Sequence, residues 1–159
     1  MPKVRPLTPI HSRGCGPICI KMAVDYFDMP YSLSHIDKIS RCRQKGGLTN
    51  KDLLATLKRL GLSVSTKRRS SWKDLRSLNT EKNVVILSWM LNGYVGHYSV
   101  LDKVTSEHIY LADPEKSDII KISKFKFMRL WFDYEDIWYP QKTSDIQLRW
   151  LAVVKKSKE

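Results

Sequence analysis

The chain has 159 residues, of which 42 % are hydrophobic and 28 % charged, which is ordinary for one soluble globular domain. No window approaches the roughly 18 unbroken apolar residues of a membrane helix, and the N-terminus lacks the apolar core of a signal peptide, so we expect a cytoplasmic protein without a transmembrane segment. The formal net charge of +12 predicts a solvated basic surface with weak affinity for polyanions such as RNA, although no zinc-finger spacing or aromatic–basic RNA motif is present.

The first part of the chain predicts an extended arm and then three helices. Prolines at positions 2, 6 and 9 favour extended backbone, so residues 1–13 are expected to form the arm. Apolar side chains at helical spacing predict one helix, and a serine cap and a capping box of Thr49 with Asp52 predict two more. These helices are expected over residues 17–27, from Ser32 or Ser34 to about Arg43, and from Thr49 to Leu60.

The rest of the chain changes to the pattern of strands. The run from Val84 to Trp89 is almost continuously apolar and predicts a buried strand. Strands are expected over residues 62–66, 84–89, 97–104, 108–111, 119–122 and 150–154, with short helices around 71–75 and 124–131. Helices followed by an antiparallel sheet are the signature of an α+β fold, so we expect a single domain over residues 1–159, in which one layer of helix packs on the sheet.

Cys15 is the candidate nucleophile, because it lies in the segment Gly14-Cys15-Gly16-Pro17 at the start of the first predicted helix. Pro17 suits the first turn of a helix, where its missing N–H costs nothing. The Cys15 sulfur should then face exposed amide N–H groups, where the helix dipole favours a thiolate, the nucleophile of cysteine enzymes. Three cysteines make a poor disulfide framework and an incomplete metal site, so we expect reduced thiols, no metal and no cofactor.

A cysteine nucleophile needs a base, and the base needs a group that orients it. His97 opens a predicted strand after a glycine-flanked turn, and Asp113 follows the next strand. Adjacent antiparallel strands bring the start of one next to the end of the other, so the two side chains should meet at one sheet edge. We therefore predict a triad of Cys15, His97 and Asp113, with Gly14, Gly96 and Tyr98 along the path of the substrate.

Several segments of the chain fit one known pattern when they are taken together. They are Cys15-Gly16-Pro17, Gly47-Leu48-Thr49, Leu60-Gly61-Leu62, Gly96-His97-Tyr98-Ser99-Val100 and Ile109-Tyr110-Leu111-Ala112-Asp113-Pro114, with Phe127 and Trp131 after them. In these motifs the sequence, from about residue 9 to 154, resembles the C39 peptidase family of papain-like cysteine peptidases, which includes the leader-processing domains of bacteriocin exporters. The resemblance implies a papain-like fold with N-terminal helices on a C-terminal antiparallel sheet. It also implies cleavage of peptides, often after a Gly-Gly leader, by Cys15, His97 and Asp113.

One departure from the family pattern concerns the oxyanion. The family usually has a Gln several residues before the Cys that donates to the oxyanion, but residues 8–13 contain none, and Pro9 lies near the expected place. Losing one such donor typically costs about 10²–10³ in rate. His11 and Ser12 are the candidate substitutes, alongside the backbone N–H of Cys15.

Three functions remain open at this point. The first is a cysteine peptidase, or an enzyme of related thiol–acyl chemistry such as transfer or deamidation, acting on a peptide or protein and controlled by a cognate inhibitor or immunity protein. The second is a non-catalytic module that binds a leader peptide or a protein partner, as the missing Gln allows. The third is a toxin-like effector whose basic surface acts on RNA.

Overall fold

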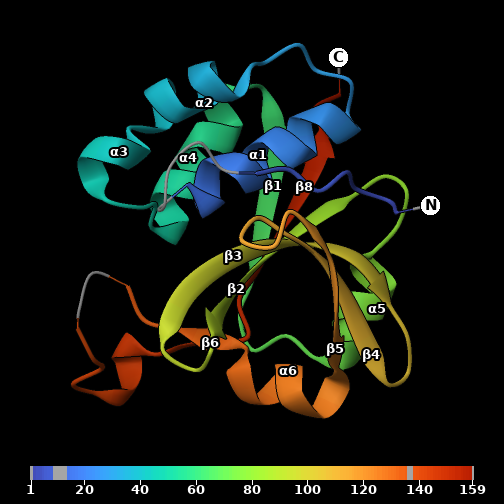
Figure 1. The fold of residues 1–159 in the computed structure, drawn as a ribbon, viewed down its shortest axis with the longest axis vertical. Coiled ribbons are helices and arrows are strands. Elements are labelled where there is room, and N and C mark those ends of the chain that lie inside the picture. Colours follow the sequence, from blue (N-terminus) through green and yellow to red (C-terminus); the bar gives the residue numbers. More distant parts are fainter. Residues whose placement is uncertain (1, 9–13, 136–137, 159) are drawn as a thin grey trace.

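The centre of the molecule is an antiparallel sheet in the strand order β1-β8-β2-β3-β4-β5 (Figure 1). The computed structural model describes residues 2–8, 14–135 and 138–158. The sheet strands are β1 (Leu62–Lys67), β2 (Val84–Leu91), β3 (Val95–Val104), β4 (His108–Asp113), β5 (Asp118–Ser123) and β8 (Leu151–Lys156). The predicted antiparallel α+β architecture is therefore confirmed, and each predicted strand is present with ends shifted by at most a few residues.

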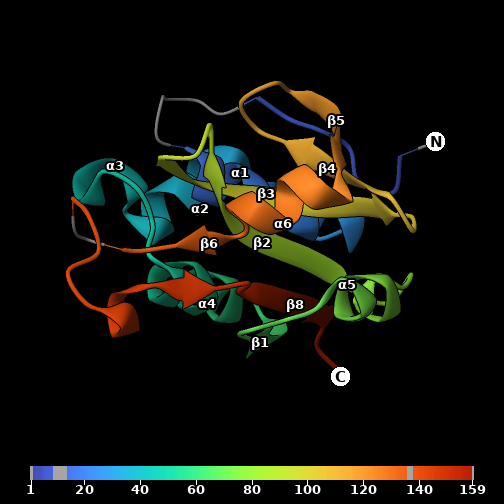
Figure 2. The ribbon, with the colours of Figure 1, turned by 90° about the horizontal axis from the view of Figure 1, so that it is seen from below.

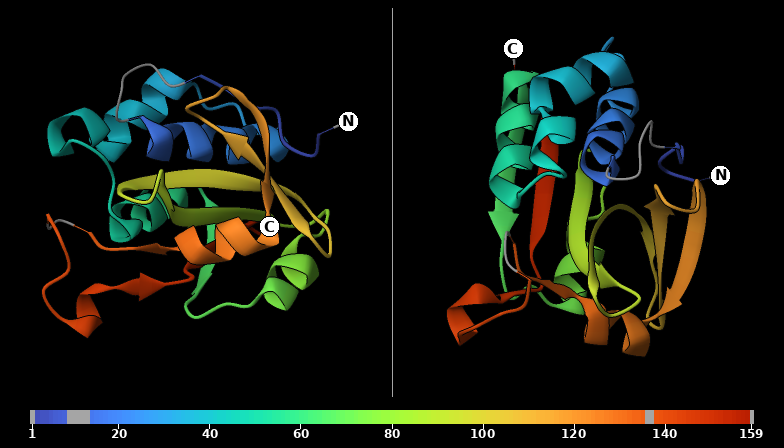
Figure 3. Two further views of the ribbon diagram at one scale, coloured as in Figure 1. Left: turned by 60° about the horizontal axis from the view of Figure 1, so that its bottom comes forward. Right: turned by 60° about the vertical axis from the view of Figure 1, so that its left-hand side comes forward.

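One face of the sheet is covered by the helices of the first part of the chain. These are α1 (Cys15–Tyr26), α2 (Leu33–Ser40), α3 (Cys42–Lys45) and α4 (Asn50–Arg59). These helices, blue to teal in Figure 3, lie together: α1 packs against β3, α4 packs against β1, and α2 packs against α1 and α4. The core between them consists of fully buried aliphatic side chains, such as Ile18 and Leu57 from the helices and Ile86 from β2. This packing fixes the start of α1 over the central strands.

The opposite face of the sheet carries a second core under two helices, α5 (Trp72–Leu78) and α6 (Lys124–Leu130). Figure 2 shows these two helices from below. Phe127 and Trp131 are fully buried there. The expectation of a single helical layer is therefore wrong. The cause is visible in β2, whose alternate residues Ile86 and Leu87 belong to different cores and are both fully buried. A near-continuously apolar strand needs cover on both faces.

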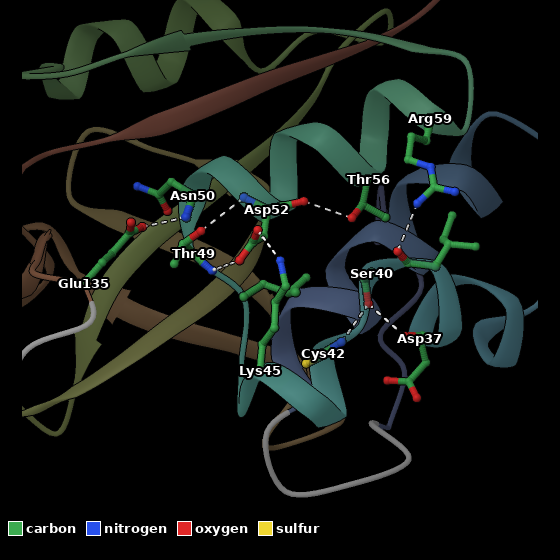
Figure 4. Close-up of polar contacts among 12 residues, drawn as sticks. Asp37, Ser40, Cys42, Lys45, Thr49, Asn50, Asp52, Thr56, Arg59 and Glu135 are labelled. Carbon is green, nitrogen blue, oxygen red and sulfur yellow. Dashed lines mark hydrogen bonds and ion pairs between the residues drawn. The ribbon is translucent and has the colours of Figure 1, made fainter.

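The second predicted helix is interrupted, so its predicted end at about Arg43 is wrong. α2 ends at Ser40, Arg41 takes the left-handed conformation with φ of 58°, and α3 then starts at Cys42. The Ser40 hydroxyl donates to the Asp37 carbonyl at 3.0 Å and accepts from the Cys42 N–H at 3.3 Å (Figure 4). A serine that bonds to the backbone in this way competes with helical hydrogen bonds, which explains the break.

The start of α4 is fixed by the predicted capping box. Thr49 Oγ1 accepts from the Asp52 N–H at 3.1 Å, and Asp52 Oδ2 accepts from the Thr49 N–H at 3.4 Å (Figure 4). Lys45 Nζ lies 2.6 Å from Asp52 Oδ1, which ties the end of α3 to the start of α4. The segment between these helices is thereby held in one place, and it forms a wall of the cleft described below.

Three short elements in the described part of the chain were not predicted. Strands β6 (Phe132–Asp133) and β7 (Gln147–Leu148) pair into a small second sheet, and a 3₁₀ turn, η1 (Thr143–Asp145), precedes β7. They are too short to leave a periodic pattern in the sequence. Near the N-terminus, the backbone N–H groups of Lys3 and Val4 both donate to Asp102 Oδ1, which fastens this part of the chain to β3.

Candidate active site

Cys15 is the first residue of α1, and its side chain is partly exposed in a cleft of about 1120 Å³. Gly14 precedes it as the N-cap and contributes no side chain to the capping. The helix begins two residues before the predicted start at Pro17, because proline is tolerated at any position of the first turn, where no N–H is used. The Cys15 backbone N–H lies among the amide groups of the helix start, which have no partner within the helix.

His97 and Asp113 lie side by side at one end of the sheet. His97 is close to the start of β3, and Asp113 is the last residue of β4, which pairs antiparallel with β3. His97 Nε2 is hydrogen-bonded to Asp113 Oδ1. The second carboxylate oxygen of Asp113 accepts the Lys116 N–H at 3.2 Å. Both side chains are buried, with exposed fractions of 6 % for His97 and 0 % for Asp113.

The environment of His97 favours its protonated form. Burial alone would favour the neutral ring, but hydrogen bonds to Asp113 and Cys15, together with the negative charge of these two groups, raise the pKa of His97 to about 9. Burial alone would raise the pKa of the Asp113 carboxyl, but the hydrogen bond and charge of His97 hold it below its usual range. At neutral pH the ring is therefore an imidazolium beside a carboxylate.

The structure thus brings Cys15, His97 and Asp113 together from α1, β3 and β4. Since Nε2 of His97 bonds to Asp113, Nδ1 is the ring nitrogen left for the hydrogen bond to Cys15. An imidazolium at this position carries a proton on Nδ1 that is available for a leaving group. The arrangement can perform nucleophilic attack on a carbonyl, followed by general acid catalysis.

Tyr98 forms part of the cleft wall together with the segment between α3 and α4. Its hydroxyl donates to Asn50 Oδ1 at 2.7 Å and to the Leu48 carbonyl at 3.1 Å. Glu135 Oε1 accepts the Asn50 N–H at 2.6 Å, which joins the chain after β6 to the start of α4 (Figure 4). Tyr98 therefore holds the wall in place and lines the cleft, although its hydroxyl is already engaged.

The other predicted substrate and oxyanion residues are placed differently. Gly96 lines the cleft, and a side chain at this position would come within 3.1 Å of Asp133 Oδ1, so only a glycine leaves the passage open. Gly14 is buried at the helix start and is not among the described residues that line the cleft. His11 and Ser12, the candidate oxyanion donors, lie outside the described residues.

The cleft is acidic although the chain as a whole is strongly basic. Among its described lining residues, the carboxylates of Asp52, Glu115, Asp133 and Glu135 stand against the single ammonium of Lys45, which is itself paired with Asp52. Burial raises the pKa of Asp133 despite a hydrogen bond from Ser88 at 2.7 Å. The basic residues that give the net charge of +12 therefore lie mostly outside the cleft.

Gly16 is required by the close approach of Leu48, and its replacement is predicted to weaken the site. A Cβ atom at residue 16 would lie 2.8 Å from Leu48 Cδ1 and 3.2 Å from Leu48 Cβ. We expect Gly16→Ala to lower the free energy of unfolding by about 1–3 kcal/mol, because overpacking displaces Leu48 and the cleft wall with it. Urea denaturation measures this effect. In the double variant with Leu48→Ala the penalty of Gly16→Ala should shrink, and purely additive effects would contradict the assignment.

Two residues beside the triad were missed by sequence reasoning. Ser99 donates from Oγ to Asp113 Oδ1 at 3.0 Å, and Trp89 Nε1 donates to Ser99 Oγ at 3.0 Å. Ser99 is fully buried. A serine followed by the apolar Val100 and Leu101 in a predicted strand was the available signal, since a buried hydroxyl needs a partner.

The C39 peptidase family model matches residues 8–140, which is most of the chain. The chain belongs to the peptidase C39 family. The recognition from the motifs is therefore confirmed, and the match covers Cys15, His97 and Asp113. Sequence relatives of this C39 chain include the sublancin-168-processing and transport ATP-binding proteins SunT of Bacillus subtilis strain 168 and of Bacillus phage SPbeta, each 26 % identical over 142 residues. These alignments cover 85 % of this chain but only 19 % of each relative, so the chain spans about a fifth of their length.

Solved structures of the same family confirm the papain-like fold. The peptidase domain of Streptococcus ComA, a bi-functional ABC transporter involved in a quorum-sensing pathway, superposes with a TM-score of 0.73 at 19 % identity, covering 96 % of this C39 chain and 99 % of that domain. A double-glycine-motif protease from an AMS/PCAT transporter, solved in complex with the leader peptide, gives a TM-score of 0.71 at 18 % identity. The superposition covers 97 % of this C39 chain and 92 % of that protease. No helix in the part of the C39 chain that the structure describes is long and apolar enough to cross a membrane.

Proposed function

We propose that the chain is a cysteine peptidase that cleaves a peptide through a triad of Cys15, His97 and Asp113. The observation that carries this proposal is the hydrogen bond between Asp113 and His97, together with the position of His97 and Cys15 on the wall of the same cleft of about 1120 Å³. A nucleophile, a base and an orienting carboxylate in this order are the minimal set for acyl transfer by a thiol. Family membership supports the same assignment.

The proposed reaction follows from the protonation states of these three groups. The Cys15 thiolate attacks the substrate carbonyl carbon, and the backbone N–H of Cys15 at the start of α1 donates to the developing oxyanion. The His97 imidazolium then gives its Nδ1 proton to the leaving amine, and an acyl thioester remains on Cys15. Neutral His97 takes a proton from water, the resulting hydroxide attacks the thioester, and the carboxylic acid and the thiolate–imidazolium pair are released.

The proposed substrate is a peptide with a Gly-Gly sequence before the scissile bond. Gly96 and Asp133 both line the cleft beside His97, and Gly96 leaves room there for a peptide backbone. The double-glycine-motif protease that was solved with its leader peptide has the same fold, and the SunT relatives are described as processing sublancin-168.

The second oxyanion donor remains a proposal outside the described residues. The family's Gln is absent from residues 8–13, and His11 or Ser12 is the proposed replacement. If the Cys15 N–H were the sole oxyanion donor, the rate of cleavage would be lower by about 10²–10³ than with two donors. His11→Ala and Ser12→Ala, measured one at a time against an otherwise unchanged chain, identify the donor by which one lowers kcat without a change in KM.

Two alternative functions make different predictions. A non-catalytic module would bind the Gly-Gly peptide without forming a thioester. An effector acting on RNA is disfavoured by the acidic cleft around Cys15, because four carboxylates against one lysine repel a phosphate backbone from this part of the molecule.

The test uses synthetic peptides that differ only at the proposed cleavage site. A peptide of about 25 residues with Gly-Gly at its centre is incubated with the protein, and the products are identified by mass spectrometry. We expect one new N-terminus directly after Gly-Gly, and no product from the matched peptide in which both glycines are valine. Binding of the Gly-Gly peptide without any product over a day would favour the non-catalytic module instead.

A further inference from the structure

We infer that Ser99 and Trp89 are positioning residues that hold Asp113 in the orientation in which it meets His97; this inference rests on the proposed function of the triad. Trp89 Nε1 donates to Ser99 Oγ at 3.0 Å, and Ser99 Oγ donates to Asp113 Oδ1 at 3.0 Å. The same Asp113 oxygen bonds to His97 Nε2. Trp89, Ser99, Asp113 and His97 are thus joined by one continuous chain of hydrogen bonds.

The strand register explains how these side chains come to lie in one row. Trp89 of β2 is the direct cross-strand partner of His97 of β3. Ser99 follows His97 by two residues, so both point to the same face of β3. Asp113 ends the neighbouring strand β4. Three adjacent strands of one rigid sheet therefore contribute the row, which fixes the positions of its members more firmly than a loop could.

The hydroxyl of Ser99 determines which way the Asp113 carboxylate turns. A carboxylate is free to rotate about its χ2 bond, and it is fixed only when both oxygens have donors. Ser99 Oγ donates to Asp113 Oδ1, the oxygen that also bonds to His97, and the Lys116 N–H donates to Asp113 Oδ2. Without the hydroxyl, Oδ1 would be held by His97 alone, and the imidazolium would lose part of its oriented partner.

Trp89 contributes a second contact in addition to its hydrogen bond. Its ring lies edge-on to the His97 ring, with 5.6 Å between centroids and 75° between planes. Trp89 is 2 % exposed, so the indole also keeps water from the bond between His97 and Asp113. A hydrogen bond between charged groups is stronger when water is excluded. The indole N–H in turn fixes the direction of the Ser99 hydroxyl, because Ser99 Oγ accepts from Trp89 and donates to Asp113.

The test measures alkylation of Cys15 by iodoacetate as a function of pH, which needs no substrate. Iodoacetate is an anion, so it reacts rapidly with the thiolate only while His97 is protonated, and the rate falls as pH rises through the pKa of His97. The thiols of Cys19 and Cys42 do not compete, because burial raises the pKa of both, to about 11 for Cys42. Mass spectrometry of the peptides assigns the label to each cysteine.

The fall of the labelling rate at high pH is the alkaline limb of this profile. In Ser99→Ala we expect this limb to move to lower pH, and the maximal labelling rate to fall about three- to tenfold. Ser99→Thr keeps the hydroxyl and should restore the position of the limb. The matched control is Ser70→Ala, since Ser70 is also fully buried but its Oγ bonds to the Lys67 carbonyl, away from the triad. A lower rate with an unmoved limb would show a merely structural role and overturn the inference.

Trp89→Phe tests the second residue and serves if Ser99→Ala fails to fold. It keeps an aromatic ring beside His97 but removes the N–H, so we expect a smaller shift of the limb in the same direction. Trp72→Phe is the matched control, because Trp72 Nε1 donates to the Thr105 carbonyl at 2.9 Å within the same core. An equal shift in the control, or none in Trp89→Phe, would overturn the role of Trp89.

The same measurement separates this inference from the proposed function. If Cys15 of the unaltered protein reacts no faster than Cys19 and Cys42, the thiolate–imidazolium pair is absent and the peptidase proposal itself fails. If Cys15 reacts rapidly with a limb near pH 9 and Ser99→Ala leaves that limb in place, the peptidase proposal stands and the positioning role is refuted.

Discussion

Replacing Cys15 with alanine is expected to abolish cleavage of a Gly-Gly peptide completely while the protein stays folded. The sulfur is the atom that would form the thioester, and no other described thiol can replace it, because Cys19 and Cys42 are buried. Cys15 itself is partly exposed at a helix start, so loss of the sulfur leaves no large cavity and should change the free energy of unfolding by less than about 1 kcal/mol. Product formation by mass spectrometry and urea denaturation measure the two quantities.

The control for this experiment is Cys42→Ala, which removes a buried thiol outside the triad. We expect this variant to keep its cleavage activity at a somewhat lower stability, because a buried side chain is truncated. Undiminished cleavage by Cys15→Ala would contradict the nucleophile assignment. Inactivity of both variants would point to a shared effect on the fold rather than to chemistry.

Replacing His97 with alanine is expected to lower kcat/KM by about 10²–10⁴ and to change the pH dependence of the thiol. With His97 present, iodoacetate labelling of Cys15 should decline as pH rises through about 9, since the imidazolium loses its proton there. Without the ring, no imidazolium attracts the anionic reagent, so this decline should disappear and labelling at neutral pH should be slow. Labelling rates between pH 5 and 10 provide the measurement.

His108→Ala is the matched control, because His108 also lies on a sheet strand but at the opposite end of β4 from Asp113. Its labelling profile should follow that of the unaltered protein. Asp113→Ala should give an intermediate result, in which the decline persists but moves to lower pH, since the carboxylate helps to raise the pKa of His97. A decline that stays near pH 9 in His97→Ala would refute His97 as the titrating group.

Much of the fold was predictable from local patterns, and the differences have local causes. An apolar run predicted the strand at 84–89, alternating patterns predicted those at 62–66 and 97–104, and the Thr49–Asp52 capping box was predicted from its residues. The break after Ser40 was not predictable, because it depends on a hydroxyl that bonds to the backbone and on a left-handed Arg41. The second helical layer was missed since the helices at 72–78 and 124–130 were each identified but not assigned to a face.

The candidate site was predictable only where the sequence carried a motif. Cys15, His97 and Asp113 could be proposed because each lies at a recognisable boundary of an element. Ser99 offered only the signal of a buried hydroxyl, and its contacts with Trp89 and Asp113 depend on the pairing of β3 with β2 and β4, which no local pattern specifies. Acidic residues such as Asp133 and Glu115 reach the cleft from a short strand and a turn, and their convergence is a property of the folded chain alone.

The reactive pair is assembled from segments that leave the ribosome far apart in time. Cys15 belongs to α1, which is synthesised before β3 and β4, the strands that carry His97 and Asp113. An isolated helix of this length is only marginally stable in water, so the nascent thiol has neither an aligned helix dipole nor an imidazolium beside it. The proposed peptidase activity would therefore require the assembled sheet, and an unfinished polypeptide would lack it.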